Sequence, residues 1–205
     1  MRALLLGLAL MAPALPAAAQ GSAPENAAPQ NAAVARGERL AAERSCGACH
    51  GERGVSATPS IPSLAGQQRE FIALQLVLFR EGLRDVAAMK EPSEGLSDEA
   101  VEDLGAYFAS LRHAPPPDRA RRNVPAYNNG AALSNRLRCG VCHLPNLVGQ
   151  NQVPHIAGQR EEYLADTLKA YRDNNRHGTD TQMNAVVQGL TDAQISQIAH
   201  YVSQR

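Results

Sequence analysis

Two short motifs of cysteine and histidine are the most chemically distinctive feature of this sequence. They read Cys-Gly-Ala-Cys-His at residues 46–50 and Cys-Gly-Val-Cys-His at residues 139–143. Two thiols separated by two residues can form thioethers with one haem, and the adjacent histidine then lies under the iron as its proximal ligand. The motifs therefore predict two covalently bound haem c groups. The residues concerned are Cys46, Cys49, Cys139 and Cys142 as thioether anchors, with His50 and His143 as axial ligands.

Three other uses of these cysteines explain less of the pattern. A thioredoxin-like redox pair does not require a histidine after both motifs. Structural zinc sites draw their cysteines from shorter spacings than the distance between residues 46 and 139. Disulfides between the two pairs would leave both histidines unexplained.

Methionine is the candidate ligand for the opposite side of each iron. Met1 and Met11 belong to the first segment of the chain, which leaves Met89 and Met183, each seven residues before a leucine. A thioether favours the ferrous state, so His/Met ligation raises the reduction potential relative to two histidines. His177, six residues before Met183, is the alternative ligand in the second half.

Other residues are candidates to support the haems. The carbonyls of Pro62 and Pro154 are expected to accept the free ring N–H of the axial histidines, although these prolines could also only turn the chain. Four polar residues are candidates either to face the haem propionates or to begin solvated helices, namely Gln67, Arg69, Gln159 and Arg160. Three histidines lack a repeat partner and receive no function, namely His113, His155 and His200.

The chain is a duplication of one domain. Ile-Pro-Ser-Leu-Ala-Gly-Gln at residues 61–67 recurs as Val-Pro-His-Ile-Ala-Gly-Gln at residues 153–159. Gly37 and Gly130 each lie nine residues before the first cysteine of a motif. A proline-rich segment at residues 113–118 separates the halves as a stiff spacer.

Each copy shows the same helical pattern. A first helix is expected to begin near the glycine and run toward the cysteines, and a second follows each Ala-Gly-Gln segment, where apolar residues recur at spacings of three and four. The third opens at Ser97 or at Thr191, where Gln194 completes a capping box. No useful strand-like alternation is present, so the sequence predicts an all-α fold.

Composition and charge limit the function classes. Aromatic residues make up only 4% of the 205 residues, so two porphyrins would help to fill the cores. The net charge is zero, which excludes a global basic footprint for nucleic acid. Residues 20–118 carry 9 basic and 14 acidic residues, whereas residues 119–205 carry 10 and 6, so a charge of −5 faces one of +4. Such a dipole would orient docking with partners, or it is neutral drift between duplicates.

The first segment predicts export to the periplasm. Arg2, an apolar run and three alanines form a signal peptide over residues 1–19, with cleavage near Ala19. An uncleaved anchor is the weaker alternative, because the apolar run is about half of the roughly 20 residues that a span needs. We expect a flexible lead-in at residues 20–35, domain 1 at 36–112, a linker at 113–125 and domain 2 at 126–205.

From residue 36 to residue 204, the sequence resembles the cytochrome c4 family. The resemblance rests on the two haem motifs, the Pro-x-(Leu/Ile)-Ala-Gly-Gln segments, the distal methionines and the duplication. It implies two tandem class I cytochrome c domains related by an approximate twofold axis, with haems meeting near the interface. It further implies a periplasmic carrier, with possible peripheral membrane association, that takes electrons from a quinol-oxidising complex toward a terminal oxidase.

Two other functions compete with a simple carrier. One is the cytochrome c subunit of a periplasmic dehydrogenase complex that oxidises a sulfur compound or an alcohol. The other is a dihaem enzyme, which would need an open, bis-His or Cys-ligated haem. We expect no enzyme activity, because every cysteine is committed to haem and His/Met ligation leaves no open iron position.

Overall fold

The computed structural model describes residues 27–176 and 182–205. Within these residues the regular secondary structure is helical, apart from one isolated β-bridge between Gln150 and Val153. The expected all-α fold is confirmed. The expected signal peptide at residues 1–19, the lead-in up to residue 26 and the alternative ligand His177 lie outside the described residues.

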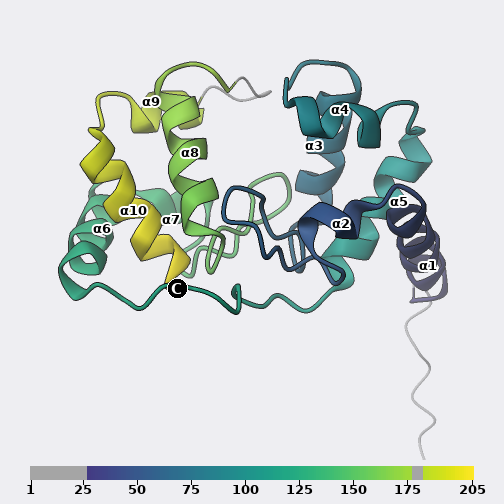
Figure 1. Ribbon diagram of the computed structural model, residues 1–205, viewed down its shortest axis with the longest axis horizontal. Coiled ribbons are helices and arrows are strands. Elements are labelled where there is room, and N and C mark those ends of the chain that lie inside the picture. The colour runs from purple at the N-terminus through teal and green to yellow at the C-terminus, as the bar shows by residue number, and fades with distance from the viewer. Residues whose placement is uncertain (1–26, 177–181) are drawn as a thin grey trace, which may run out of the picture.

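The described helices follow the same order in both repeats (Figure 1). The first repeat contains α1 (Ala27–Glu43), α2 (Cys46–His50), α3 (Arg69–Arg80), α4 (Ala87–Ser93) and α5 (Asp98–Ser110). The second contains α6 (Val124–Arg136), α7 (Cys139–Cys142), α8 (Glu161–Arg172), α9 (Gln182–Val187) and α10 (Asp192–Ser203). Helices α3 and α8 lie toward the middle of the molecule, and the pairs α1/α5 and α6/α10 form its two flanks (Figure 1).

A glycine lies where the first and last helices of each repeat cross. A Cβ atom on Gly37 would lie 2.0 Å from the carbonyl oxygen of Asp103, and one on Gly130 would lie 2.0 Å from that of Gln197. The same close approach therefore joins α1 to α5 and α6 to α10. This explains the two glycines that the sequence places nine residues before each haem motif.

Each repeat has its own apolar core. The core of the first repeat is built around Leu104 and Val101 of α5 together with Ile72 of α3. The core of the second repeat is built around Ile195 of α10 and Leu164 of α8. The apolar stripes expected for α5, α8 and α10 pack in these cores. For α3 the spacing predicts a stripe of Phe71, Leu74 and Leu78, but the helix contributes Ile72 and Ala73 to the core instead.

Helix caps fix the start of α5 and α10. The side chain of Ser97 accepts a hydrogen bond from the N–H of Ala100, as an N-cap should. Thr191 accepts from the N–H of Gln194, whose side chain in turn accepts from the N–H of Thr191, so the expected capping box is present.

The first helix begins earlier than the sequence suggested. Residues 27–35 belong to α1, although we expected them to be part of a flexible lead-in. Alanine has the highest helix propensity, but its small side chain gives little apolar periodicity, so the pattern did not reveal this helix. Ala33 is buried, which shows that part of this stretch packs against the domain.

The linker is bonded along its course to the second repeat. The N–H of Asn123 donates to Nε2 of His200 over 2.9 Å, and Arg122 donates to the carbonyl of Gln204. The ring of His113 stacks on that of His155, with centroids 4.1 Å apart. The spacer is therefore held against the domains as well as being stiffened by proline.

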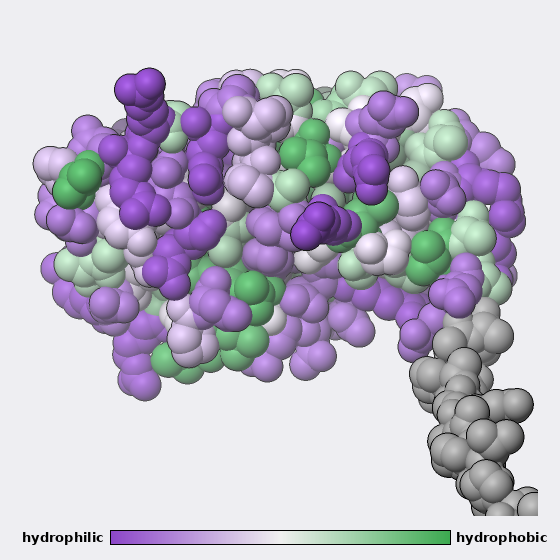
Figure 2. All heavy atoms as spheres, turned by 90° about the horizontal axis from the view of Figure 1, so that it is seen from below, coloured by the Kyte–Doolittle hydropathy of each residue, from purple (hydrophilic) through white to green (hydrophobic). Residues whose placement is uncertain are grey.

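The surface on the side of the linker is largely polar. Figure 2 shows apolar residues there in separate small groups between hydrophilic ones. Among the described helices, none is long and apolar enough to cross a membrane.

Candidate haem-binding sites

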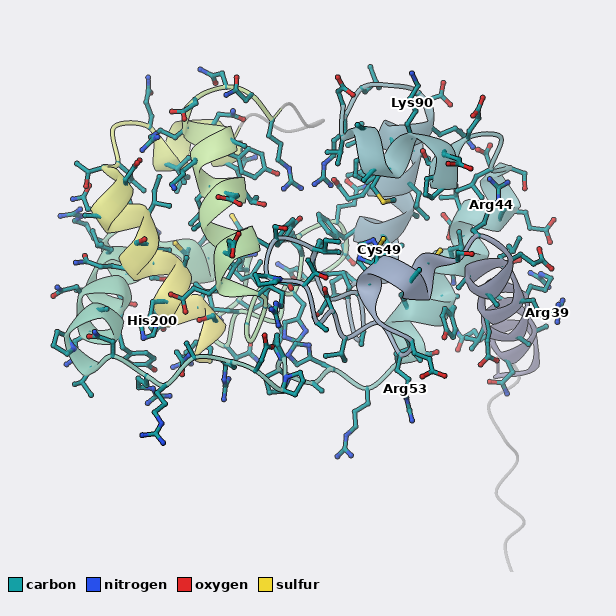
Figure 3. The ribbon with its side chains drawn as sticks, in the orientation of Figure 1. Arg39, Arg44, Cys49, Arg53, Lys90 and His200 are labelled. Carbon is teal, nitrogen blue, oxygen red and sulfur yellow. The ribbon has the colours of Figure 1, made fainter. Side chains whose placement is uncertain are left out.

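The Cys-x-x-Cys-His motifs form one tight helical turn in each repeat. Ser45 and Arg138, which precede the two motifs, both adopt the left-handed conformation, with φ of 54° and 58°. A turn of helix places residues three apart on the same face, so the paired thiols of each motif point the same way. The first cysteine of each pair is half-buried and the second is exposed, and all four thiols are free of disulfides. Figure 3 labels Cys49, which lies on α2.

Both motif histidines are buried and hydrogen-bonded as the sequence suggested. Nδ1 of His50 lies 2.8 Å from the carbonyl oxygen of Pro62, and Nδ1 of His143 lies 3.0 Å from that of Pro154. A carbonyl oxygen can only accept, so Nδ1 carries the proton in both rings and Nε2 is left with a lone pair. That is the tautomer that a metal-ligating histidine requires.

Burial also sets the charge of these rings. It lowers the pKa of His50 and of His143 below the ordinary value, and the hydrogen bonds to the proline carbonyls oppose this only partly. Both imidazoles are therefore neutral at pH 7. The neutral form is the one that coordinates a metal.

The candidate distal methionines lie on two short helices that the sequence did not predict. Met89 lies on α4 and Met183 on α9, and both side chains are half-buried. The hydroxyl of Ser93 donates to the carbonyl of Met89 over 2.7 Å, and Asn184 donates to the carbonyl of Tyr171 at the end of α8. These bonds fix the two short helices, but they do not test which side chain binds iron.

Two glutamines that we considered as propionate contacts bind the other repeat instead. Oε1 of Gln67 accepts from the N–H of His155 over 2.7 Å, and its Nε2 donates to the His155 carbonyl over 2.9 Å. Oε1 of Gln159 accepts from the N–H of Ser63 over 2.8 Å, and its Nε2 donates to the Ser63 carbonyl over 2.9 Å. Such reciprocal contacts are what an approximate twofold axis produces.

The two arginines that we considered for the same role are also engaged elsewhere. Arg69 forms an exposed ion pair with Glu102. Arg160 is buried, forms an ion pair with Asp118 of the linker, and donates to the carbonyl of Ser56 in the first repeat. Arg160 therefore ties the second repeat to both the linker and the first repeat.

A different pair of arginines meets between the repeats. Arg84 follows α3 and Arg176 follows α8, and both donate to Oε1 of Gln75, over 2.5 Å and 3.4 Å. Each guanidinium also lies over an aromatic ring of its own repeat, Phe79 or Tyr171, 4.5 and 4.8 Å from the ring centroid. The two arginines are 92 residues apart, as Gln67 and Gln159 are, so the duplication carried a signal that we overlooked.

This arginine pair lacks a carboxylate partner among the described residues. Burial lowers the pKa of Arg84. Burial would raise the pKa of the Tyr163 hydroxyl, but the charges and hydrogen bonds of Arg176 and Arg84 outweigh this and lower it to about 8. The Tyr163 phenol is thus the acidic group beside the two cations. Among the described residues no carboxylate pairs with either arginine, so the pair is suited to bind the carboxylate of another group.

Comparison with known proteins identifies relatives of both repeats. Residues 127–205 match the family model described as Cytochrome c, and residues 32–108 match the one described as Cytochrome C oxidase, cbb3-type, subunit III. Cytochrome c4 of Pseudomonas aeruginosa is 32% identical over 82% of this chain and 87% of that protein. A thiosulfate dehydrogenase electron acceptor of Thiomonas intermedia is 32% identical over 78% of this chain and 77% of that protein.

A solved structure agrees with these sequence matches. The crystal structure of reduced recombinant cytochrome c4 from Pseudomonas stutzeri superposes with a TM-score of 0.75 and 29% identity, over 83% of this chain and 97% of that chain. The tandem class I cytochrome c fold expected from the sequence is therefore confirmed. The chain belongs to the cytochrome c4 family and carries two covalently bound haem c groups.

Proposed function

We propose that the protein is a periplasmic electron carrier that takes electrons from a quinol-oxidising complex and delivers them toward a terminal oxidase. The main support for this proposal is that both repeats contain the same two candidate iron ligands. Each repeat contains a neutral histidine that is oriented by a proline carbonyl, and one methionine on a short helix. A site with two protein ligands on the iron is suited to electron transfer, because no position is left for a substrate.

The residues present fit two haems. Cys46 and Cys49 would hold one and Cys139 and Cys142 the other, since each pair shares one face of a helical turn. The axial pairs would be His50 with Met89 and His143 with Met183. Arg84 and Arg176, which form no ion pair with a carboxylate among the described residues, match the negative charge of propionates. When bound, haem c supplies a one-electron change between Fe(III) and Fe(II), for which the chain provides attachment, orientation and charge.

The protein is proposed not to be an enzyme, and ligand binding tests this directly. Carbon monoxide should bind slowly and incompletely to both haems of the reduced, purified protein. Rapid binding to one haem would indicate an open iron position and would favour a catalytic role.

A second candidate function is that of electron acceptor within a dehydrogenase complex. The relative from Thiomonas intermedia, named a thiosulfate dehydrogenase electron acceptor, favours this alternative. A deletion strain separates the two functions. Loss of quinol-dependent oxidase activity, restored by the full-length chain, would support the carrier. Normal oxidase activity with loss of only thiosulfate-dependent respiration would support the dehydrogenase partner.

The proposed location depends on the segment before the described residues. Export predicts that the mature protein from the periplasmic fraction begins at Gln20, after removal of residues 1–19. Mass spectrometry of the purified protein tests this. A mass that retains residue 1 would contradict cleavage and would favour an uncleaved anchor.

A further inference from the structure

The two interdomain glutamines, Gln159 and Gln67, bind the same kind of main-chain group in the opposite repeat. Gln159 binds the main chain of Ser63, and Gln67 binds the main chain of His155. Both glutamine side chains are buried, with 7% and 6% of their surface exposed. Each Oε1 also accepts the N–H of the residue after the glutamine, over 2.9 Å, so the amide group is fixed in one orientation.

Each target residue directly follows the proline that orients an axial histidine. The N–H of Ser63 and the carbonyl of Pro62 belong to one peptide group, and so do the N–H of His155 and the carbonyl of Pro154. The first of these peptide groups therefore bonds to Gln159 at its N–H and to His50 at its carbonyl. The second bonds to Gln67 at its N–H and to His143 at its carbonyl.

These contacts form two chains of hydrogen bonds that cross the interface in opposite directions. One runs from Gln159 of the second repeat, through the 62–63 peptide, to the ring of His50 in the first. The other runs from Gln67 of the first repeat, through the 154–155 peptide, to the ring of His143 in the second. Hydrogen bonds in such a series polarise one another, so an acceptor at the N–H end makes the carbonyl a stronger acceptor for the histidine.

We propose that Gln67 and Gln159 are positioning residues that each tune the axial histidine of the opposite repeat. The inference rests on the proposed roles of His50 and His143 as iron ligands. A stronger acceptor for the Nδ1 proton makes the imidazole a better electron donor through Nε2, which stabilises the ferric state. Docking of one repeat therefore lowers the reduction potential of the haem in the other, and the interface serves as part of both redox sites.

Substitution by methionine tests this on the full-length protein with both haems attached. Gln159→Met keeps a side chain of similar length but removes the acceptor, and the potential of the haem held by His50 should rise. Gln67→Met should instead raise the potential of the haem held by His143. The two potentials are followed by spectroelectrochemical titration and are assigned with Met89→Ala, which should displace only the potential of the first repeat.

Gln68 provides a matched control on the same interface. Its Nε2 donates to the carbonyl of Val148 in the other repeat over 2.8 Å, and its side chain forms no hydrogen bond to either proline peptide. Gln68→Met therefore removes an interdomain hydrogen bond without breaking a chain to a histidine. It should leave the difference between the two potentials unchanged.

The NMR signal of the Nδ1 proton of each histidine gives a second readout. If the glutamines had only a structural role, a substitution in one repeat would not selectively shift the histidine signal of the other repeat. In the reduced, 15N-labelled protein its NMR signal should shift upfield for His50 in Gln159→Met and for His143 in Gln67→Met, as the hydrogen bond weakens. Three results would overturn the inference. The potentials and signals could stay unchanged, or they could shift only in the mutated repeat. They could also shift equally in both repeats, as in Gln68→Met.

Haem content and ligation separate this test from that of the proposed function. A pyridine haemochrome spectrum reports two haems in the wild-type protein if the attachment sites are right. A protein with fewer haems, or without an imidazole ligand, would contradict the proposed sites themselves. Two haems with normal ligation and uncrossed shifts would overturn only the role of the glutamines.

Discussion

Tyr163 lies next to a local excess of positive charge, that of Arg84 and Arg176. Its pKa falls to about 8 because two guanidinium groups reach it and, among the described residues, no carboxylate neutralises them. Charge-assisted bonds between arginine and carboxylate are strong and planar, and haem brings propionates that the sequence does not show. We therefore expect Arg84 and Arg176 to hold propionates close to the joint between the repeats.

Removing either of these charges should lower the reduction potential of the protein. A nearby cation favours the electron-bearing state, so Arg84→Gln and Arg176→Gln should each disfavour reduction by on the order of 1 kcal/mol. Arg39→Gln and Arg136→Gln remove the same charge from exposed positions, and Arg39 lies on the outer flank of the first repeat (Figure 3). Spectroelectrochemical titration compares the four variants. Equal shifts in all four would contradict a special role for the central pair.

The sequence revealed the residues that bind within one repeat better than those that bind across the interface. Cysteine, histidine and proline spacing located both motifs and the carbonyls of Pro62 and Pro154, because these contacts are local in the chain. For Gln67 and Gln159 the sequence suggested propionate contacts or solvated helix starts and missed their bonds to the other repeat. Their partners lie in the other repeat, and no spacing within one repeat encodes how two copies dock.

Helix α1 crosses α5, and α6 crosses α10, at a distance that only glycine allows. A Cβ atom on Gly37 or Gly130 would meet a backbone carbonyl at 2.0 Å and a tyrosine Cβ at 2.7 Å, and neither neighbour is a flexible side-chain end. The crossing positions each haem motif, since α1 leads directly into α2 and α6 into α7. The helix pair is thus the frame on which the cysteines are presented.

Gly37→Ala and Gly130→Ala should each destabilise the protein, although alanine normally stabilises a helix by about 1 kcal/mol relative to glycine. Overpacking at the crossing should outweigh that gain and cost about 2 kcal/mol or more. Thermal unfolding of the haem-loaded protein measures this, with Gly82→Ala as the control. Gly82 has φ of 68° and open space around it, so only backbone strain of about 1 kcal/mol should appear there. Stabilisation by either helix substitution would contradict the close crossing.

Apolar periodicity and capping residues predicted the long helices but not the short ones. Helices α3, α8, α5 and α10 have apolar stripes or capping residues that mark their positions. Helices α4 and α9, which carry the methionines, have 7 and 6 residues, too few to show a repeating apolar face. Alanine hid the first part of α1 in the same way.

At the scale of the whole molecule, the two repeats and the linker meet at a pair of stacked histidines. Nδ1 of His113 faces the carbonyl of Ala65, and Nδ1 of His155 faces that of Gly66. Burial lowers the pKa of both rings, and the neighbouring His113 helps to lower that of His155 to about 4. Both rings are therefore neutral when the repeats are docked at pH 7.

This pair should make the docked state sensitive to acid. The unfolded protein binds a proton at His155 near pH 6.5, whereas the folded protein resists it until about pH 4. Stability from this group is therefore complete above pH 6.5 and is lost as the pH falls toward 4, by roughly 2 kcal/mol. His155→Phe keeps a stacking ring that cannot titrate. In denaturant unfolding, the free energy of unfolding of this variant should rise relative to that of the wild type as the pH falls through that window. A difference in unfolding free energy that stays constant with pH would contradict the account.

The central claim is that each of the two haems has one histidine and one methionine as its axial ligands. Spectra recorded during a redox titration test this claim most directly. The oxidised wild-type protein should show the red charge-transfer band of a methionine-ligated haem, and two one-electron steps should account for both haems. Met89→Ala and Met183→Ala should each remove part of that band and lower one potential, while the other step stays in place. An unchanged spectrum in either variant would show that another group binds that iron and would contradict the proposed ligation.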